Sequence, residues 1–286
     1  MRSVRTGLGL TIAFHLGGLA PLSAQQRPTF GRGFDIGARS LWLSCSGTGS
    51  PTVLLEAGQA ETADTWTQVQ PRIAAFTRAC SYDRAGLGRS DRASEEGHRK
   101  GQAVIADLDK LLAAGGESGP FILVGHSLGG ALVRLYAAAH PRGAAGLVLV
   151  DAVHEREFVA IDELLTSEQR VAGSGMRPLS PEGLDIEAVL AELGAARSLD
   201  SIPLVVVARG RPLGDDEMPP SWSPDQRRRR EELRRSLQAD LVTRSTAGEL
   251  VVAARSGHFV HHEEPGVVVR AVRRLVDRWR AKQGRR

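Results

Sequence analysis

A serine between two glycines stands where an apolar run of the sequence gives way to a helical pattern. Residues 121–126 have the composition of a buried strand, and residues 128–140 have apolar residues at helical spacing. Gly125 and Gly129 flank the junction two residues either side of Ser127. This is the nucleophile-elbow pattern, in which strained backbone exposes the serine hydroxyl and tiny neighbours avoid a collision. It predicts Ser127 as a nucleophile at the positive end of the following helix.

A serine nucleophile needs a base, and the segment SGHFVHHEEP offers one. His258 comes directly after the last strand-like run of the chain and a Ser-Gly pair. Because parallel strands end at the same edge of a sheet, we expect His258 to reach Ser127. His261 and His262 begin a helix and are expected at the surface. No second group of residues has the spacing of metal ligands, so no metal and no cofactor is predicted.

Strand-like and helix-like segments alternate along the chain and must position these side chains. Helical spacing of apolar residues is clear in residues 101–115 and again in the closing segment from residue 264. Such alternation predicts an α/β fold, with a mostly parallel sheet flanked by helices on both faces. The strand-like runs are residues 32–45 (as a hairpin), 52–58, 79–91 (a strand that runs into a glycine-rich loop), 121–127, 144–152, 202–210 and 249–258.

Residues 153–200 interrupt this rhythm, because they contain no strand-like run. The stretches FVAIDELL and LDIEAVLAELGAARSL have the spacing of short amphipathic helices, and the residues between them are expected to be a connecting loop. A long insertion between two strands is typical of a functional lid. We therefore predict an α/β core from residues 25–152 and 201–286, with a short helical lid or cap at 153–200.

The composition is that of a globular protein, and the N-terminus is that of an exported one. The 286 residues are 42% hydrophobic and 24% charged, with a formal net charge of +4, which suits one large α/β domain. Residues 1–24 have arginines, an apolar run and small residues, the layout of a secretory signal peptide. We expect a periplasmic or secreted protein without a stable membrane anchor. The arginine-rich residues 225–238 have interleaved glutamates and no aromatic platform, so a solvated helix face is expected and no nucleic-acid partner.

With these motifs the chain resembles the α/β-hydrolase fold family, and within it the serine esterases and lipases. The resemblance covers nearly all of the chain after the signal segment, and is carried by VGHSLGG at the elbow, YDRAGLGRSD at 82–91 and SGHFVHHEEP at 256–265. It implies an eight-stranded sheet in which the second strand lies antiparallel to the fourth. That arrangement would place Cys45 near Cys80, and a disulfide between them is inferred, in keeping with export.

The resemblance leaves the third member of a Ser-His-acid triad open between two places. Asp151 ends the sixth strand-like run, whereas Asp215 and Asp216 follow the seventh by several residues. The family mostly uses an acid after the seventh strand, and some members use the sixth. Asp151 is favoured here, because an acid that orients the base must hold a fixed place beside it.

An oxyanion hole needs two backbone N–H groups. The resemblance assigns one to Leu128, directly after the nucleophile, and the other to Gln59, in the loop after residues 52–58. The family's usual His-Gly in that loop appears here as Ala57-Gly58. Only a backbone donor is required, so the departure points to a different loop geometry rather than to a lost site.

These residues predict an exported serine hydrolase that cleaves a small-molecule carboxylic ester, or a lactone, thioester or amide, through an acyl-enzyme. A serine in place of aspartate at the elbow argues against dehalogenase or epoxide hydrolase chemistry. Two alternatives stay open: a non-catalytic binding protein on a hydrolase scaffold, and an acyl transferase or carbon–carbon hydrolase that uses the same triad. The sequence sets no oligomeric state.

Overall fold

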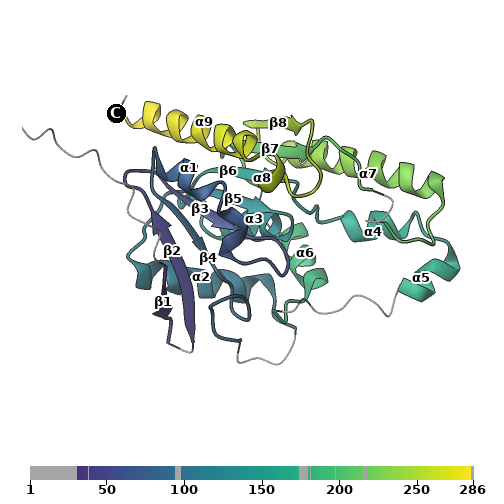
Figure 1. Ribbon diagram of the computed structural model, residues 1–286, viewed down its shortest axis with the longest axis horizontal. Helices are drawn as coiled ribbons and strands as arrows, with labels where there is room; N and C mark the ends of the chain where they lie inside the picture. Colours follow the sequence, from purple (N-terminus) through teal and green to yellow (C-terminus); the bar gives the residue numbers. More distant parts are fainter. Residues whose placement is uncertain are drawn as a thin grey trace, which may run out of the picture.

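A single eight-stranded sheet runs through the molecule (Figure 1). The computed structural model describes residues 31–37, 39–93, 98–173, 180, 182–196, 198–214 and 218–284, so the predicted signal segment lies outside the described residues. The strand order is β1-β2-β4-β3-β5-β6-β7-β8. The strands are β1 (Arg32–Asp35), β2 (Ser40–Ser46), β3 (Thr52–Glu56), β4 (Ala79–Tyr82), β5 (Phe121–His126), β6 (Ala144–Val150), β7 (Leu204–Arg209) and β8 (Gly248–Ala253).

The sheet is mostly parallel, as the alternating pattern predicts. Only β2 runs against its neighbours, pairing antiparallel with β1 and with β4, whereas every pair from β4 to β8 is parallel. Parallel neighbours need crossover connections, and these are helical. The predicted α/β fold with an eight-stranded sheet is therefore confirmed.

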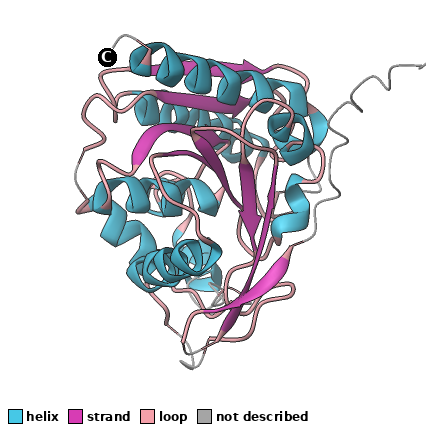
Figure 2. Cartoon of the chain, turned by 90° about the vertical axis from the view of Figure 1, so that its left-hand side faces the viewer, coloured by secondary structure: helices cyan, strands magenta, loops and turns pink. Residues whose placement is uncertain are grey.

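Helices cover both faces of the sheet (Figures 1 and 2). Successive residues of a strand point to opposite faces, so Leu123 of β5 packs into one core cluster and Val124 into the other. The first cluster is closed by α2, α3 and α6, and the second by α1 and α9. The helices are α1 (Gln70–Ala74), α2 (Gly101–Gly115), α3 (Leu128–Ala139), α4 (Glu157–Asp162), α5 (Ser167–Gly173), α6 (Ile186–Gly194), α7 (Pro224–Val242), α8 (Val260–Glu263) and α9 (Pro265–Gln283).

The insertion between β6 and β7 contains α4, α5 and α6. The sequence predicts a connecting loop where α5 forms. The Thr166 hydroxyl accepts a hydrogen bond from the Gln169 N–H, and the Gln169 side chain accepts one from the Thr166 N–H. This reciprocal cap starts a helix that has little apolar periodicity. At the other end of the insertion, α6 buries Val189, Leu190 and Leu193 in the same core as α3, so this part of the predicted lid belongs to the main helical layer.

Cys45 and Cys80 lie directly opposite one another in the β2–β4 pairing, and a disulfide joins them. The bond links strands whose residues are separated by 35 positions in the sequence. Among the described helices, none is long and apolar enough to cross a membrane.

Candidate active site

Ser127 occupies a strained turn between β5 and α3. Its φ of 51° and ψ of −119° lie outside the regions that a residue with a side chain normally adopts. The surrounding backbone holds this conformation, because the Ser127 N–H donates to the Val150 carbonyl at 3.1 Å and the Ser127 carbonyl accepts from Gly130 and Val153, each at 3.0 Å. The strain is thus imposed by two neighbouring segments, as is common for a functional residue.

The flanking glycines leave no space for a side chain. A Cβ on Gly125 would lie 2.4 Å from the Gly129 carbonyl oxygen, and a Cβ on Gly129 would lie 2.5 Å from the carbonyl oxygens of both Glu56 and Ala57. Such distances are far inside van der Waals contact, and the atoms concerned are backbone. The glycines at the elbow are therefore required by the close approach of β5, α3 and the end of β3.

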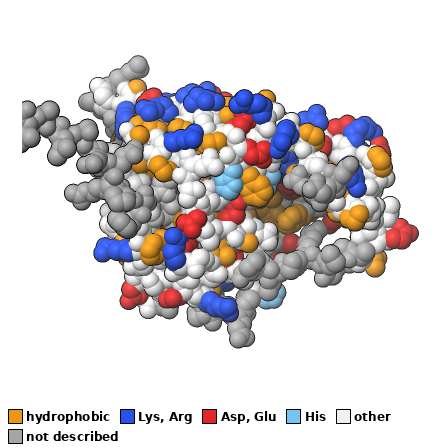
Figure 3. Space-filling model, viewed as in Figure 1, with side chains coloured by type: hydrophobic (Ala, Val, Ile, Leu, Met, Phe, Trp, Pro, Cys, Tyr) orange, Lys and Arg blue, Asp and Glu red, His pale blue; other side chains and the backbone are white. Residues whose placement is uncertain are grey.

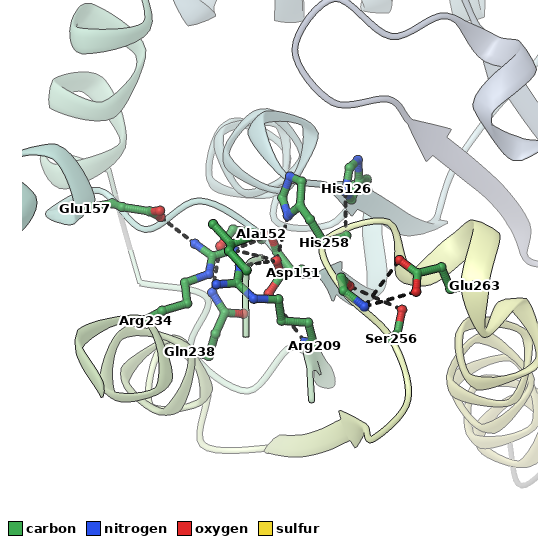
Figure 4. Close-up of polar contacts among 12 residues, drawn as sticks. His126, Asp151, Ala152, Glu157, Arg209, Arg234, Gln238, Ser256, His258 and Glu263 are labelled. Atoms are coloured by element: carbon green, nitrogen blue, oxygen red, sulfur yellow. Dashed lines mark hydrogen bonds and ion pairs between the residues drawn. The ribbon is translucent and has the colours of Figure 1, made fainter. Parts of the chain in front are cut away.

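The structure brings His258 and Asp151 together (Figure 4). Asp151 directly follows β6, and His258 lies between β8 and α8. The His258 Nδ1 and the Asp151 Oδ2 are 2.6 Å apart, and the Asp151 side chain is fully buried. An Nδ1–H that donates to this carboxylate leaves Nε2 as the basic nitrogen. Within the described residues no hydrogen bond joins Ser127 to His258, a contact that is often long in an enzyme without substrate.

Two arginines surround the Asp151 carboxylate. Arg209 of β7 places Nη1 3.2 Å from Oδ2, and Arg234 of α7 places Nη2 3.1 Å from the same oxygen. Burial by itself would raise the pKa of Asp151, but the charges of Arg234 and Arg209 and the hydrogen bond from His258 outweigh it and hold that pKa well below its usual range. The carboxylate is therefore ionised wherever His258 could act as a base.

The sequence interpretation misses this role of α7, whose residues 225–238 were expected to be a solvated face. Arg234 is only 6% exposed and also donates to the Asp151 carbonyl at 2.5 Å, while Gln238 donates to the Ala152 carbonyl at 2.7 Å. Arg234 and Gln238 are four residues apart, and so share a helix face with the buried Leu237 and Leu241. The buried leucines of that face are the one signal in the sequence that could have identified it.

The remaining predicted residues fall in different places. Asp215 and Asp216 lie outside the described residues. His261 is fully buried, contrary to the expectation of a surface residue, because its ring packs against Trp66 and one ring nitrogen lies 2.7 Å from the Thr65 hydroxyl. Burial lowers the pKa of His261 well below its usual value. His262 is exposed on the same short helix.

The predicted oxyanion donors lie on two backbone segments. Leu128 begins α3, where N–H groups have no acceptor within the helix. Gln59 is exposed in a turn in which the Glu61 N–H donates to the Gly58 carbonyl at 3.3 Å and Ala60 has a φ of 60°. The Gln59 N–H donates to no described residue. Both donors are thus free to bind an oxygen that carries negative charge.

Arg84 holds the backbone at the start of this turn by hydrogen bonds. It is 2% exposed, and it donates to the carbonyls of Ala57 at 2.7 Å and Gly58 at 2.6 Å. Its charge is balanced by Glu56 at the end of β3 and by Glu182 from the insertion, each 2.6 Å away. Burial alone would lower the pKa of Arg84, but the two carboxylates outweigh it and raise it. Arg84 lies in the YDRAGLGRSD motif. The sequence therefore indicates the importance of this loop, but it does not predict that Arg84 holds the backbone of Ala57 and Gly58.

The face of the molecule in Figure 3 has a hollow beside which histidine and hydrophobic side chains gather. Phe259, next to the predicted base, is 43% exposed. The His258 side chain is 27% exposed. A small molecule with an apolar part could therefore reach the histidine from solvent.

Comparison with known proteins agrees with the observed fold. Residues 51–177 match the family model described as alpha/beta hydrolase fold. The AB hydrolase superfamily protein of Gibberella zeae is 27% identical over 285 residues, covering 79% of this chain and 86% of that protein. "Probable transporter efuK" of Hormonema carpetanum is 34% identical over 130 residues, which are 43% of this chain but only 19% of that protein.

Solved structures share the fold. The haloalkane dehalogenase DbeA-M1 loop variant from Bradyrhizobium elkanii superposes with a TM-score of 0.63 at 15% identity, covering 89% of this chain and 98% of that chain. An identity this low supports the architecture alone, because one fold carries many chemistries. The chemistry must therefore be argued from the residues of the site.

Proposed function

Since this chain belongs to the α/β-hydrolase fold family, we propose that it is an exported serine hydrolase that cleaves a carboxylic ester through a Ser127-His258-Asp151 triad. The observation that carries the proposal is the 2.6 Å contact between His258 Nδ1 and a buried, ionised Asp151, beside a serine in the strained elbow conformation. A serine that only closed a turn would need neither the strain nor a histidine oriented by an acid.

The mechanism follows from the roles of these groups. His258 Nε2 takes the proton of Ser127 as Oγ attacks the carbonyl carbon. The resulting oxyanion accepts hydrogen bonds from the N–H groups of Leu128 and Gln59. His258 then gives the proton to the leaving alcohol, and water, activated by the same nitrogen, releases the acid and restores Ser127. Asp151 keeps the imidazole oriented and stabilises its charged form throughout.

The experiment is the hydrolysis of p-nitrophenyl esters from acetate to palmitate by the chain without residues 1–24. Ser127→Ala should abolish turnover and labelling by a fluorophosphonate probe, because both need the activated hydroxyl. The control is Ser236→Ala, which removes an exposed hydroxyl on α7. The ester chain length with the highest turnover would then indicate the length of acyl chain that the pocket accommodates.

Other outcomes favour the alternatives. A wild-type protein that hydrolyses no ester and resists the probe would favour a binding protein on a hydrolase scaffold. A protein that reacts with the probe but turns over no ester, lactone, thioester or amide would favour acyl transfer or carbon–carbon hydrolysis. If activity depended on Asp215 and Asp216 instead of Asp151, measured with the double Asp→Asn variant, the assignment of the acid would be wrong.

Export is part of the proposal and rests on residues 1–24. The Cys45–Cys80 disulfide supports it, because structural disulfides persist mainly outside the cytosol. Cell fractionation with N-terminal sequencing tests it: a processed chain outside the cytoplasm is expected, and an intact N-terminus in the cytosol would contradict it.

A further inference from the structure

Glu61 connects the turn of the predicted oxyanion donor to the rest of the site. Its carboxylate oxygen Oε2 accepts a hydrogen bond from the Gly58 N–H at 2.6 Å, while its own N–H donates to the Gly58 carbonyl. These two bonds close the turn around Gln59. The side chain of Glu61 therefore fixes the backbone from which the oxyanion donor projects.

The same carboxylate oxygen contacts His126, the residue before the nucleophile. His126 is 1% exposed, and its Nδ1 lies 2.9 Å from the Glu61 Oε2. On the other side of the ring, Nε2 lies 3.1 Å from the backbone carbonyl of His258. One histidine side chain thus bridges the oxyanion turn and the segment that carries the predicted base.

Both ring nitrogens of His126 face hydrogen-bonding oxygens. The Glu61 carboxylate lies at Nδ1 and the His258 carbonyl at Nε2, so the ring is held from two sides. Burial alone would raise the pKa of Glu61, but the hydrogen bond and charge of His126 outweigh it and lower that pKa. The rings of His258 and His261 lie beside His126, with centroids 4.6 Å and 4.3 Å away.

From this geometry we propose that Glu61 is a positioning residue, which acts through the buried His126 to hold the oxyanion turn, the nucleophile elbow and the His258 backbone in one arrangement. The inference rests on the proposed function. The oxyanion turn, the elbow and the His258 segment follow three different strands. Acyl transfer requires their relative positions to be correct to within a fraction of an ångström. The Glu61–His126 pair makes a direct hydrogen bond to two of them, and His126 belongs to the third.

A metal ion is the competing explanation of the same cluster. Glu61, His126 and His261 each offer one ligand atom, and these atoms lie within 4.8 Å of one another. His261 Nδ1 is buried and has no hydrogen-bond partner among the described residues. We favour the direct hydrogen bond, because Glu61 and His126 already satisfy one another at 2.9 Å whereas a metal would need to replace that bond. Metal analysis of the purified protein decides: substoichiometric metal, with activity unaffected by chelator, is expected.

The kinetic test compares Glu61→Gln with Glu192→Gln. Glu192 is also half-buried and also accepts from a backbone N–H, that of Gln102, but lies on α6 outside the site. Glu61→Gln should lower kcat for p-nitrophenyl butyrate by about 10- to 100-fold with KM and Tm nearly unchanged, and Glu192→Gln should leave kcat as in the wild type. A wild-type kcat in Glu61→Gln, or a loss that tracks unfolding by circular dichroism, would overturn the proposal.

A spectroscopic readout separates this inference from the proposed function. In protein labelled with ¹⁵N-histidine, the ring resonances of His126 should shift in Glu61→Gln and stay as in the wild type in Glu192→Gln, because only the first substitution changes the hydrogen-bond partner of the ring. Unchanged His126 resonances in Glu61→Gln, or one mole of bound metal per chain, would contradict the inference even if the enzyme is an active esterase. A shift of His126 in Glu61→Gln, in a protein that hydrolyses no ester, would instead leave the Glu61–His126 pair intact and reject the catalytic function.

Discussion

Two buried arginine clusters flank the candidate site, and they are built in opposite ways. On the acid side, one carboxylate, Asp151, is surrounded by two arginines, which pair outward with Glu231 and Glu157. On the oxyanion side, one arginine, Arg84, lies between two carboxylates and donates to two backbone carbonyls. The central group thus has the opposite sign on the two sides: a carboxylate between two arginines on one, and an arginine between two carboxylates on the other.

The difference indicates what each cluster supplies. The two arginines in contact with Asp151 keep it ionised, so the acid side sets the orientation of His258. Arg84 pairs with two carboxylates and donates to the carbonyls of Ala57 and Gly58, so its cluster sets the position of the backbone. Substitution of Asp151 should therefore affect turnover most, and substitution of Arg84 should affect stability most.

The largest expected effect comes from Asp151→Asn. An asparagine cannot hold the same tautomer of His258, so kcat for p-nitrophenyl acetate should fall by about 1,000- to 10,000-fold. The control is Asp64→Asn, whose carboxylate is 68% exposed and pairs with Arg89 outside the triad. Turnover within tenfold of wild type in Asp151→Asn would show that this residue is not the acid of the triad. It would also contradict the expected difference between the acid side and the oxyanion side.

A substitution of Arg84 tests the other side. Arg84→Met leaves Glu56 and Glu182 buried without a counter-charge, so the free energy of unfolding should fall by about 3–5 kcal/mol. Arg274→Met, which breaks an exposed pair with Glu249, should cost less than about 1 kcal/mol. Urea denaturation measures both. If Arg84→Met does not fold, Glu182→Gln, which keeps the Glu56 pair, provides the milder measurement, and equal stability of that variant and the wild type would refute the argument.

The smallest effect is a pH dependence of stability on the acid side. The pKa of Asp151 is lowered in the folded state, so its ionised form stabilises the protein above the unfolded value of about 3.9, and this stabilisation is lost as pH falls through the folded value. The difference in unfolding free energy between wild type and Asp151→Asn should therefore be constant near neutrality and shrink below about pH 4. In the Arg234→Met background the decrease should be smaller and should be complete at a higher pH, because the pKa of Asp151 in the folded state is then less depressed. A difference that grows on acidification would contradict the claim that folding lowers the pKa of Asp151.

The elbow and the sheet could be predicted because their signals are local. Ser127 is identified by its glycines and by the change from strand to helix spacing within twenty residues. The strand-like runs also mark where Asp151 and His258 leave the sheet, since both follow apolar strands at its carboxyl edge. The helix α5 was missed because its start depends on a side-chain cap at Thr166 rather than on apolar periodicity.

The contacts that orient the site could not be predicted from the sequence. Arg234 reaches Asp151 across 83 residues of sequence, Arg84 reaches Glu182 across 98, and Glu61 reaches His126 across 65. Arg234, Glu182 and Glu61 lie in stretches whose composition suits a solvated surface, and the burial of a charged side chain produces no periodic pattern in the sequence. The sequence by itself determined the succession of strands and helices along the chain and the candidate nucleophile, because hydrophobic spacing and glycine sterics act over a few residues. Only the tertiary structure decided which charges meet, because a buried ion pair depends on distant segments that bring their partners within about 3 Å.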